Sequence, residues 1–373
     1  MKIVQKLYVT IHVICLLIWS VPVSAEITVS SGAQLNRSQK EEDDSHVEEE
    51  GARTTLLVPF GVRYKYGKRL TLSAESAYSR ITDDEATVYS LADTAVSISY
   101  IIPKLPLPVM CGLMLNLPTG REDLGNEHDD TGEDVSGQGL NLGLNLSISK
   151  KYLENFTFGV NTQYAYQGAY DSTDDVPDDT TDPGDHLMGN IKVQWKYSPA
   201  LKLGAMVSYL YLWPEKVGGQ KMSQEGGMLT INGNTEITRQ PFVFGLNAQY
   251  KVPGISKTRV DGKLVTEDEN GRGQTLGTSV NMTYIRSQTL VFQGSGSLQY
   301  TRESEYRESG LPYAGTTMQI RVGPGVTYHI TPALQCNLSA RYTQATGKAS
   351  LQAEYDTTSR GFNLMLGVAY TLK

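Results

Sequence analysis

The sequence predicts an all-β protein, a transmembrane antiparallel up-and-down β-barrel. The clearest observation is a strict alternation from Gly139 to Ser149, where leucine or isoleucine holds every even position and asparagine, glycine or serine every odd one. Because successive side chains of a strand point to opposite faces, such a strand has one apolar and one polar face. The pattern returns along the chain with almost no wholly apolar strand. Lipid outside a barrel and water inside it explain both faces.

The first 25 residues predict a secretory signal peptide. Lys2 and Lys6 form a basic start, an apolar stretch covers residues 7–21, and Val23-Ser24-Ala25 is a small-residue cleavage site. A transmembrane anchor is the alternative, but the apolar run is shorter than the roughly 20 residues that a membrane-crossing helix needs. We therefore expect the mature chain to start near residue 26, and residues 26–373 to form one barrel domain.

The last residues resemble the terminal strand signal that the bacterial barrel-assembly machinery reads, which makes this machinery an expected partner during biogenesis. Gly367, Tyr370 and Leu372 fit the signal, whereas Lys373 stands where an aromatic residue usually ends it. Both ends of the chain thus indicate the outer membrane of a Gram-negative cell.

The composition alone would indicate a soluble protein, with a mean hydropathy of -0.30 and 39% hydrophobic residues. A barrel explains these values, because its strands need apolar residues only at every second position. Tyrosine outnumbers phenylalanine 22 to 7. Many tyrosines fall near the ends of expected strands and, with Trp195 and Trp213, predict aromatic girdles at the two membrane interfaces. Cys111 and Cys336 fall on the outward side of distant strands, which indicates lipid-facing residues rather than a disulfide or a metal site.

Sixteen strands are expected, with fourteen as the fallback. Their ranges are 26–37, 53–65, 69–81, 91–102, 107–117, 137–149, 155–167, 186–197, 201–213, 235–251, 257–266, 273–286, 288–302, 315–329, 333–345 and 359–372. Short connections, such as residues 66–68 and 198–200, alternate with long polar ones. Bacterial barrels have short turns in the periplasm and long loops outside the cell, so the first strand runs outward. This rule holds at both ends of the chain only if residues 257–266 form a strand.

The acidic residues are concentrated in three expected loops. Residues 39–52, 118–136 and 168–185 hold 21 of the 40 acidic residues but only Lys40 and Arg121 as bases. The simpler interpretation is that these loops keep the cell-surface side solvated. A more specific one is that divalent ions bridge them to anionic outer-membrane lipids, including lipopolysaccharide, although no calcium-loop spacing is present. We expect no nucleic-acid partner.

The inward side of the expected strands is rich in asparagine and glutamine, which tolerate water. The charged residues on this side include Arg63, Lys192, Arg321 and Arg341 together with Glu75 and Asp93. They predict a mildly basic lumen that favours anions. The alternative is that these residues form internal ion pairs that fill the barrel.

One stretch resembles a known family. Ala92-Asp93-Thr94-Ala95-Val96-Ser97-Ile98-Ser99-Tyr100, followed by Leu117-Pro118-Thr119-Gly120, resembles the paired "GDxxxxxxY" and "LPTG" segments of outer-membrane proteins assigned to the meta-pathway of phenol degradation. The resemblance covers residues 88–122, and Ala92 replaces the usual glycine. It implies a barrel transporter for small, often hydrophobic or aromatic, compounds. A similarity to fatty-acid channels is more distant, because no N-terminal plug precedes the first strand.

Three functional classes follow. The main prediction is a channel or transporter for passive passage of small solutes, including hydrophobic or aromatic compounds. A structural or adhesive surface barrel that displays long acidic loops is the alternative. An outer-membrane hydrolase is the least favoured class, because His46, His128 and His186 lie beside acidic residues without a nucleophile motif. We expect no enzyme activity, no cofactor and no metal site.

Overall fold

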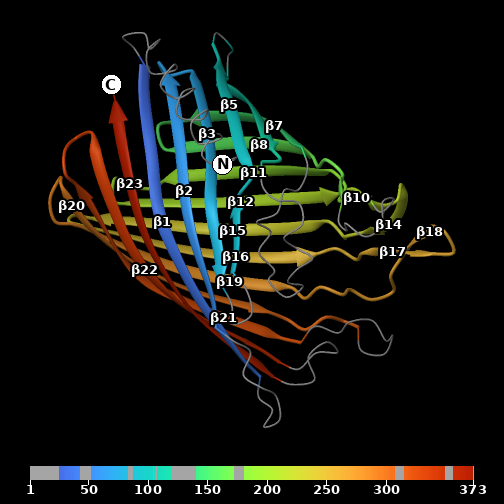
Figure 1. Ribbon diagram of the computed structural model, residues 1–373. Coiled ribbons are helices and arrows are strands. Elements are labelled where there is room, and N and C mark those ends of the chain that lie inside the picture. The colour runs from blue at the N-terminus through green and yellow to red at the C-terminus, as the bar shows by residue number, and fades with distance from the viewer. Residues whose placement is uncertain are drawn as a thin grey trace.

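The computed structural model (Figure 1) describes residues 25–42, 52–82, 87–103, 105, 107–119, 140–171, 180–306, 315–348 and 356–372. The expected signal peptide lies outside these residues except for Ala25, and so does most of the three acidic segments. Within the described residues, no helix is long and apolar enough to cross a membrane.

The strands belong to two sheets. The large sheet contains β1 (Ala25–Glu42), β2 (Arg53–Tyr66), β3 (Leu70–Thr82), β4 (Thr87–Leu91), β5 (Thr94–Ile102), β6 (Val109–Leu117), β7 (Asn141–Tyr152), β8 (Phe156–Tyr166), β11 (His186–Lys196), β12 (Leu201–Leu212), β15 (Met228–Arg239), β16 (Phe242–Pro253), β19 (Thr275–Ile285), β20 (Leu290–Thr301), β21 (Thr317–His329), β22 (Leu334–Gly347) and β23 (Thr357–Leu372). The small sheet contains β9 (Tyr170–Asp171), β10 (Thr180–Asp182), β13 (Glu215–Val217), β14 (Gln220–Gln224), β17 (Lys257–Val260) and β18 (Lys263–Thr266).

The large sheet closes on itself. β1 pairs antiparallel with β2 on one side and with β23 on the other, from Ile27 opposite Leu372 to Glu42 opposite Thr357. β4 and β5 both pair with β3 and share one place in the wall. The described residues therefore form a closed barrel of sixteen strands. The predicted all-β antiparallel barrel and its strand number are confirmed.

The two ends of the barrel differ in their connections. At the end where Ala25 and Leu372 lie, turns such as residues 67–69, 197–200 and 330–333 are short. We call this the short-turn end. At the opposite, long-loop end the connections are longer, and three of them contain the strands of the small sheet. The assignment of the short turns to the periplasm stays a prediction.

Residues 235–251 differ from the predicted single strand. The structure has two strands there, because β15 and β16 are joined at Gln240 and Pro241, and β15 already begins at Met228 within an expected loop. Proline has no backbone N–H to donate to a ladder, so a wall strand running through Pro241 would lose a hydrogen bond. The apolar outward positions change from odd numbers, such as Ile231 and Ile237, to even numbers, such as Phe244 and Leu246, and a single strand of period two does not allow this change.

Residues 257–266 also differ from the prediction, since they form a hairpin outside the wall. β17 and β18 pair with each other, with Lys257 opposite Thr266. The chain turns at Asp261 and Gly262, whose φ angles of 50° and 78° are typical of the type I′ turn that Asp-Gly favours. The predicted strand 235–251 corresponds to two wall strands, and the predicted strand 257–266 is not part of the wall. The two errors cancel, so the predicted number of wall strands is still sixteen.

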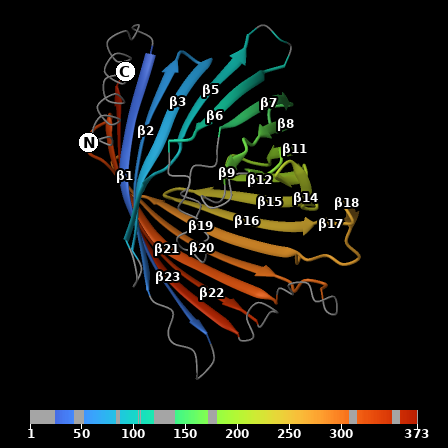
Figure 2. The same ribbon diagram turned by 45° about the vertical axis from the view of Figure 1, so that its right-hand side comes forward.

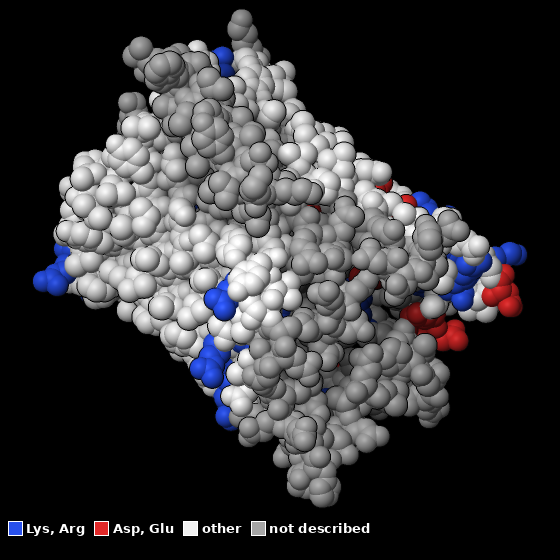
Figure 3. Space-filling model, viewed as in Figure 1, with Lys and Arg blue, Asp and Glu red and all other residues white. Residues whose placement is uncertain are grey.

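Large apolar side chains cover the outer face of the wall. Residues directly opposite each other in the ladder share a face, as Leu246 and Val280 do, and each of these is 53% exposed. Cys111 and Cys336 lie on the same face, opposite Leu146 and Val368, as free thiols. Figure 3 shows a broad uncharged expanse of this wall, with the visible Asp and Glu atoms gathered toward the long-loop end at the right. An apolar surface of this extent fits hydrocarbon rather than water.

Aromatic side chains gather at both ends of the apolar outer face. The ring centroids of Trp195 and Tyr197 are 5.1 Å apart at the short-turn end, and those of Tyr211 and Trp213 are 4.9 Å apart at the long-loop end. Trp195 lies opposite Leu203. From Leu203 to Tyr211 a strand that rises about 3.4 Å per residue spans about 27 Å along its own axis. At a strand tilt of about 40° this length spans about 21 Å across the membrane, which is close to the apolar band of about 25 Å in outer-membrane barrels.

Three long connections form one folded layer beyond the barrel rim. The small sheet has the strand order β18-β17-β14-β13-β10-β9, so the connections after β8, β12 and β16 lie side by side (Figure 2). We call this layer the loop sheet. Lys216 Nζ lies 2.8 Å from Asp182 Oδ2, and Arg272 Nη1 lies 2.7 Å from Glu225 Oε2. These contacts hold neighbouring connections together.

The contact between Asp182 and Lys216 makes the loop sheet sensitive to acid. The hydrogen bond from Lys216, aided by the backbone N–H of Gly184, lowers the pKa of Asp182 below its ordinary value of 3.8. A lowered pKa in the folded state means that the contact stabilises the loop sheet above about pH 4 and is lost as the pH falls through the lowered value. We expect the hydrogen-exchange protection of β10 and β13 to decrease in this acid range. Asp182→Asn should show decreased protection at neutral pH already, and equal protection in both proteins at pH 7 would contradict this account.

Candidate functional site

The inward face of the wall is the candidate functional site, and hydrogen-bonded amides line much of it. Asn190 Nδ2 donates to Asn161 Oδ1 at 3.1 Å, and Asn161 Nδ2 donates to Asn145 Oδ1 at 3.2 Å, which links β11, β8 and β7. Between β16 and β15, Gln249 Nε2 donates to Asn232 Oδ1 at 2.9 Å. Amides that still have free donor and acceptor capacity form a surface that water wets.

The inward side chains remain exposed to solvent. The side chains of Arg63 and Glu75 are 63% and 61% exposed, and Met114 and Met365 are 44% and 41% exposed. Their ladder partners place all four on the inward face. The side chains of the described residues therefore do not fill the barrel.

Arg321 and Arg341 come together on neighbouring strands. Arg321 lies opposite Thr343 of β22, two residues from Arg341, a diagonal position about 7 Å away across a ladder. The wall is tight between them: a Cβ atom added to Gly323 would lie 2.2 Å from the carbonyl oxygen of Ala340. Among the described residues, neither arginine has a carboxylate within ion-pair distance. The two guanidinium groups thus form a local concentration of positive charge, which we call the arginine pair.

Other charged groups on the inward face are partly neutralised. Arg63 Nη2 lies 3.9 Å from Glu75 Oε1, and Lys202 Nζ lies 2.6 Å from Glu236 Oε1. Lys192 of β11 lies opposite Gly159 of β8 and Met206 of β12. It is therefore on a different part of the wall from the arginine pair. The predicted ion pairs thus exist in part, but their side chains are solvated.

Asp93 lies at the break between β4 and β5 and takes part in the structure of the wall. Its Oδ2 accepts a hydrogen bond of 2.8 Å from Asn116 Nδ2. Beside it, the hydroxyls of Thr94 and Thr119 are 2.9 Å apart, and Thr119 Oγ1 donates to the carbonyl oxygen of Ala92 at 3.1 Å. The two resembling segments therefore meet in space, where they hold the end of β6 against this break.

Two methionines that the sequence pattern does not single out, Met188 and Met228, lie on the inward face. Met188 of β11 lies opposite Leu210 of β12, which lies opposite Met228 of β15. These three residues form an apolar row on the inward face, near the long-loop end, which we call the methionine row. Their departure from the polar alternation on three successive wall strands is the signal that could have revealed them.

The histidine sites considered for hydrolysis are only partly within the described residues, since His46 and His128 lie outside them. Asp185 does not contact its neighbour His186: it accepts hydrogen bonds from the hydroxyl of Tyr164 and from the backbone N–H of Gln167. No group of three or more histidine, cysteine, aspartate or glutamate side chains able to hold a metal occurs in the part of the chain that the structure describes.

No family model and no curated protein matches the chain. The resemblance of residues 88–122 to the phenol-degradation family therefore stays a prediction.

Several solved structures of outer-membrane proteins are similar to this chain. A bacterial polysaccharide outer membrane secretin is 10% identical, with 95% of this chain and 100% of that chain covered and a TM-score of 0.48. A mutant of the TodX monoaromatic hydrocarbon channel is 10% identical, with 95% and 91% covered and a TM-score of 0.45. OmpT of Vibrio cholerae is 9% identical, with 94% and 99% covered and a TM-score of 0.44. At these identities and TM-scores, the comparisons assign neither a substrate nor a reaction to this chain.

Proposed function

We propose that the protein is an outer-membrane channel for the passive passage of small solutes. The observation that carries this proposal is a closed barrel with an apolar outer face and a polar inward face whose side chains are solvent-exposed, such as those of Arg63 and Glu75. Water-exposed polar groups inside an apolar cylinder supply what a membrane lacks, a hydrated route across hydrocarbon. Passage through this route needs no covalent step.

The arginine pair gives the route a preference for anions. In water, two unit charges 4 Å apart attract by about 1 kcal/mol, and the attraction grows where the wall displaces water. Arg321 and Arg341 act together because they are adjacent, whereas the charge of Arg63 is offset by Glu75.

The methionine row supports the finer part of the proposal, passage of hydrophobic or aromatic compounds. Thioether side chains are flexible and polarisable, and they make favourable contacts with aromatic rings of different shapes. A solute with an apolar ring and one anionic group would contact both the methionine row and the arginine pair. Aromatic carboxylates combine these two features.

A surface-display function is the second candidate, and the loop sheet favours it. Three connections that are cross-linked by ion pairs form a defined surface beyond the rim, which suits the binding of an external partner.

Single-channel recording in planar lipid bilayers separates the two candidates. A channel should produce discrete conductance steps when the mature protein inserts. A barrel that only displays its loops should insert without conductance, and that result would overturn the channel proposal.

Replacement of both arginines by glutamine tests the origin of the anion preference. We expect Arg321→Gln with Arg341→Gln to lower the anion-to-cation permeability ratio about fivefold, the effect of about 1 kcal/mol of lost attraction. Reversal potentials in a potassium chloride gradient measure this ratio. Arg63→Gln with Glu75→Gln is the matched control and should lower it less, because removal of both charges of an ion pair leaves the net charge of the lumen unchanged. An equal effect of the control would remove the arginine pair from the selectivity mechanism.

Substitution of the methionine row tests the solute class. We expect Met188→Asn with Met228→Asn to slow benzoate entry into proteoliposomes several-fold while chloride conductance changes little, because apolar contact with the ring is lost. Thr230→Asn, an inward substitution two residues from Met228 on β15, is the control and should leave benzoate entry unchanged. If benzoate and chloride responded alike, the row would have no role in recognising the ring.

A further inference from the structure

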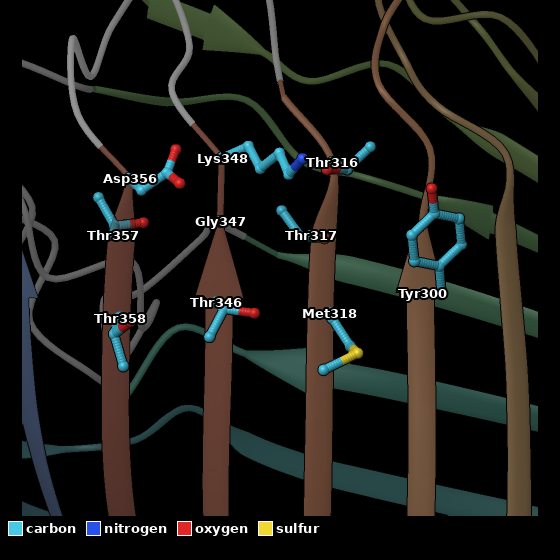
Figure 4. Close-up of a pocket in the computed structure, with 10 residues that line it drawn as sticks. All are labelled: Tyr300, Thr316, Thr317, Met318, Thr346, Gly347, Lys348, Asp356, Thr357 and Thr358. Atoms are coloured by element: carbon cyan, nitrogen blue, oxygen red, sulfur yellow. The ribbon is translucent and has the colours of Figure 1, made fainter.

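A groove with a volume of about 630 Å³ lies at the long-loop end of β20 to β23. Four of its lining residues form one cross-strand row, with Tyr300 opposite Met318, Met318 opposite Thr346, and Thr346 opposite Thr358. Figure 4 shows a second row closer to the loops, in which Thr316, Lys348 and Asp356 lie at the strand ends. This rim groove is lined by Tyr300, Thr316, Met318, Thr346, Lys348, Asp356 and Thr358, together with Thr317, Gly347 and Thr357 of the row between them.

The row of the rim groove that contains Tyr300 and Met318 faces the surroundings of the barrel, whereas Thr317, Gly347 and Thr357 belong to the neighbouring inward row. Tyr300 and Met318 are 42% and 41% exposed. Met318 lies on the same face of β21 as Ile320 and Val322, which belong to the apolar outer wall, whereas Arg321 faces inward. Because ladder partners share a face, the row that contains Met318 is an outward row.

The outer face changes in polarity step by step toward this groove. Val322, Tyr342 and Phe362 form an apolar row across β21, β22 and β23. Two residues closer to the loops come Ile320, Gln344 and Arg360, followed by the threonines of the rim groove and then by Lys348 and Asp356. This order follows the change from hydrocarbon to headgroups in a bilayer.

We propose that the rim groove binds the headgroup of a phosphorylated glycolipid in the membrane leaflet at the long-loop end. The Lys348 ammonium group supplies the positive charge for a phosphate, and Figure 4 shows its side chain extending toward Thr316. The threonine hydroxyls match the hydroxyl groups of a sugar. Met318 and Tyr300 offer an apolar floor on which the first acyl segments rest. The volume is in the range of small-molecule sites, so it holds a whole headgroup rather than a single ion.

The proposal depends on the membrane location of the barrel but not on its activity as a channel. Lys348 faces outward, so its replacement should leave single-channel conductance unchanged. A failure of lipid binding and a failure of the channel proposal are therefore distinguishable in the same protein.

Native mass spectrometry of the full mature protein in a neutral detergent, titrated with lipid A, tests the proposal. Lipid A carries phosphate groups on a glucosamine headgroup, so the wild-type protein should retain it in preference to phosphatidylcholine. We expect Lys348→Glu to weaken lipid A binding about tenfold or more, as the loss of a charge-assisted hydrogen bond predicts. Lys263→Glu, which makes the same change in the loop sheet, is the matched control and should bind lipid A normally.

Three outcomes decide the proposal. Weaker binding by both Lys348→Glu and the pair Thr346→Val with Thr358→Val, in proteins with normal conductance, would support it. Unchanged lipid A binding in these variants, or equal retention of phosphatidylcholine, would overturn it. Equally tight binding of water-soluble glucosamine 1-phosphate would also overturn the lipid assignment, since the groove would then recognise a soluble sugar phosphate.

Discussion

The hydrogen-bonded seam between β1 and β23 is the interaction on which the rest of the structure depends. A membrane offers no water to the N–H and C=O groups at a sheet edge, so an open sheet of this kind would leave two costly edges in hydrocarbon. The seam joins the two ends of the chain, and the hydroxyls of Thr28 and Thr371 approach to 3.1 Å across it. Its register also decides which face each side chain takes, because a slip of one residue would turn the outward side chains inward.

The closed wall separates an apolar outer surface from a polar inner surface. Leu246 and Val280 are exposed apolar side chains of the outer face, which is stable in contact with hydrocarbon. Aromatic clusters lie at the two ends of this face. Inside, amide chains and the arginine pair need water. The loop sheet adds a folded rim on one side of the barrel, and the rim groove lies on the outer face of other strands at the same end. These functional surfaces therefore share one scaffold without sharing side chains.

The alternation of residues predicts the wall well because period two is a local property of a strand. It predicts turns less well: at Asp261 with Gly262 the alternation continues through the turn, and at Pro241 the apolar positions only change parity, although each of these residues carries a turn signal of its own. The number of strands is right partly because these two errors compensate. The alternation also places Arg321 and Arg341 on the inward side.

Other features of the candidate site depend on long-range register, which no local pattern contains. The adjacency of Arg321 and Arg341 follows from the pairing of Arg321 with Thr343. The contact between Asp93 and Asn116 depends on how β5 pairs with β6 and on the break that precedes β5. The methionine row was missed because each methionine, taken alone, only interrupts a polar alternation. The rim groove combines four strands and could not be predicted before their relative heights were known.

The central claim is that the apolar face contacts lipid and the amide-rich face contacts water. Electron paramagnetic resonance of single spin labels in vesicles tests it directly, with labels placed in turn at the neighbouring positions of Val280 and Asn281 in a protein whose native cysteines are replaced. The account predicts that the label at position 280 is relaxed by oxygen, which concentrates in hydrocarbon, and that the label at position 281 is relaxed by a water-soluble nickel complex. Equal access of the nickel complex to both positions, or its exclusion from position 281, would contradict the account.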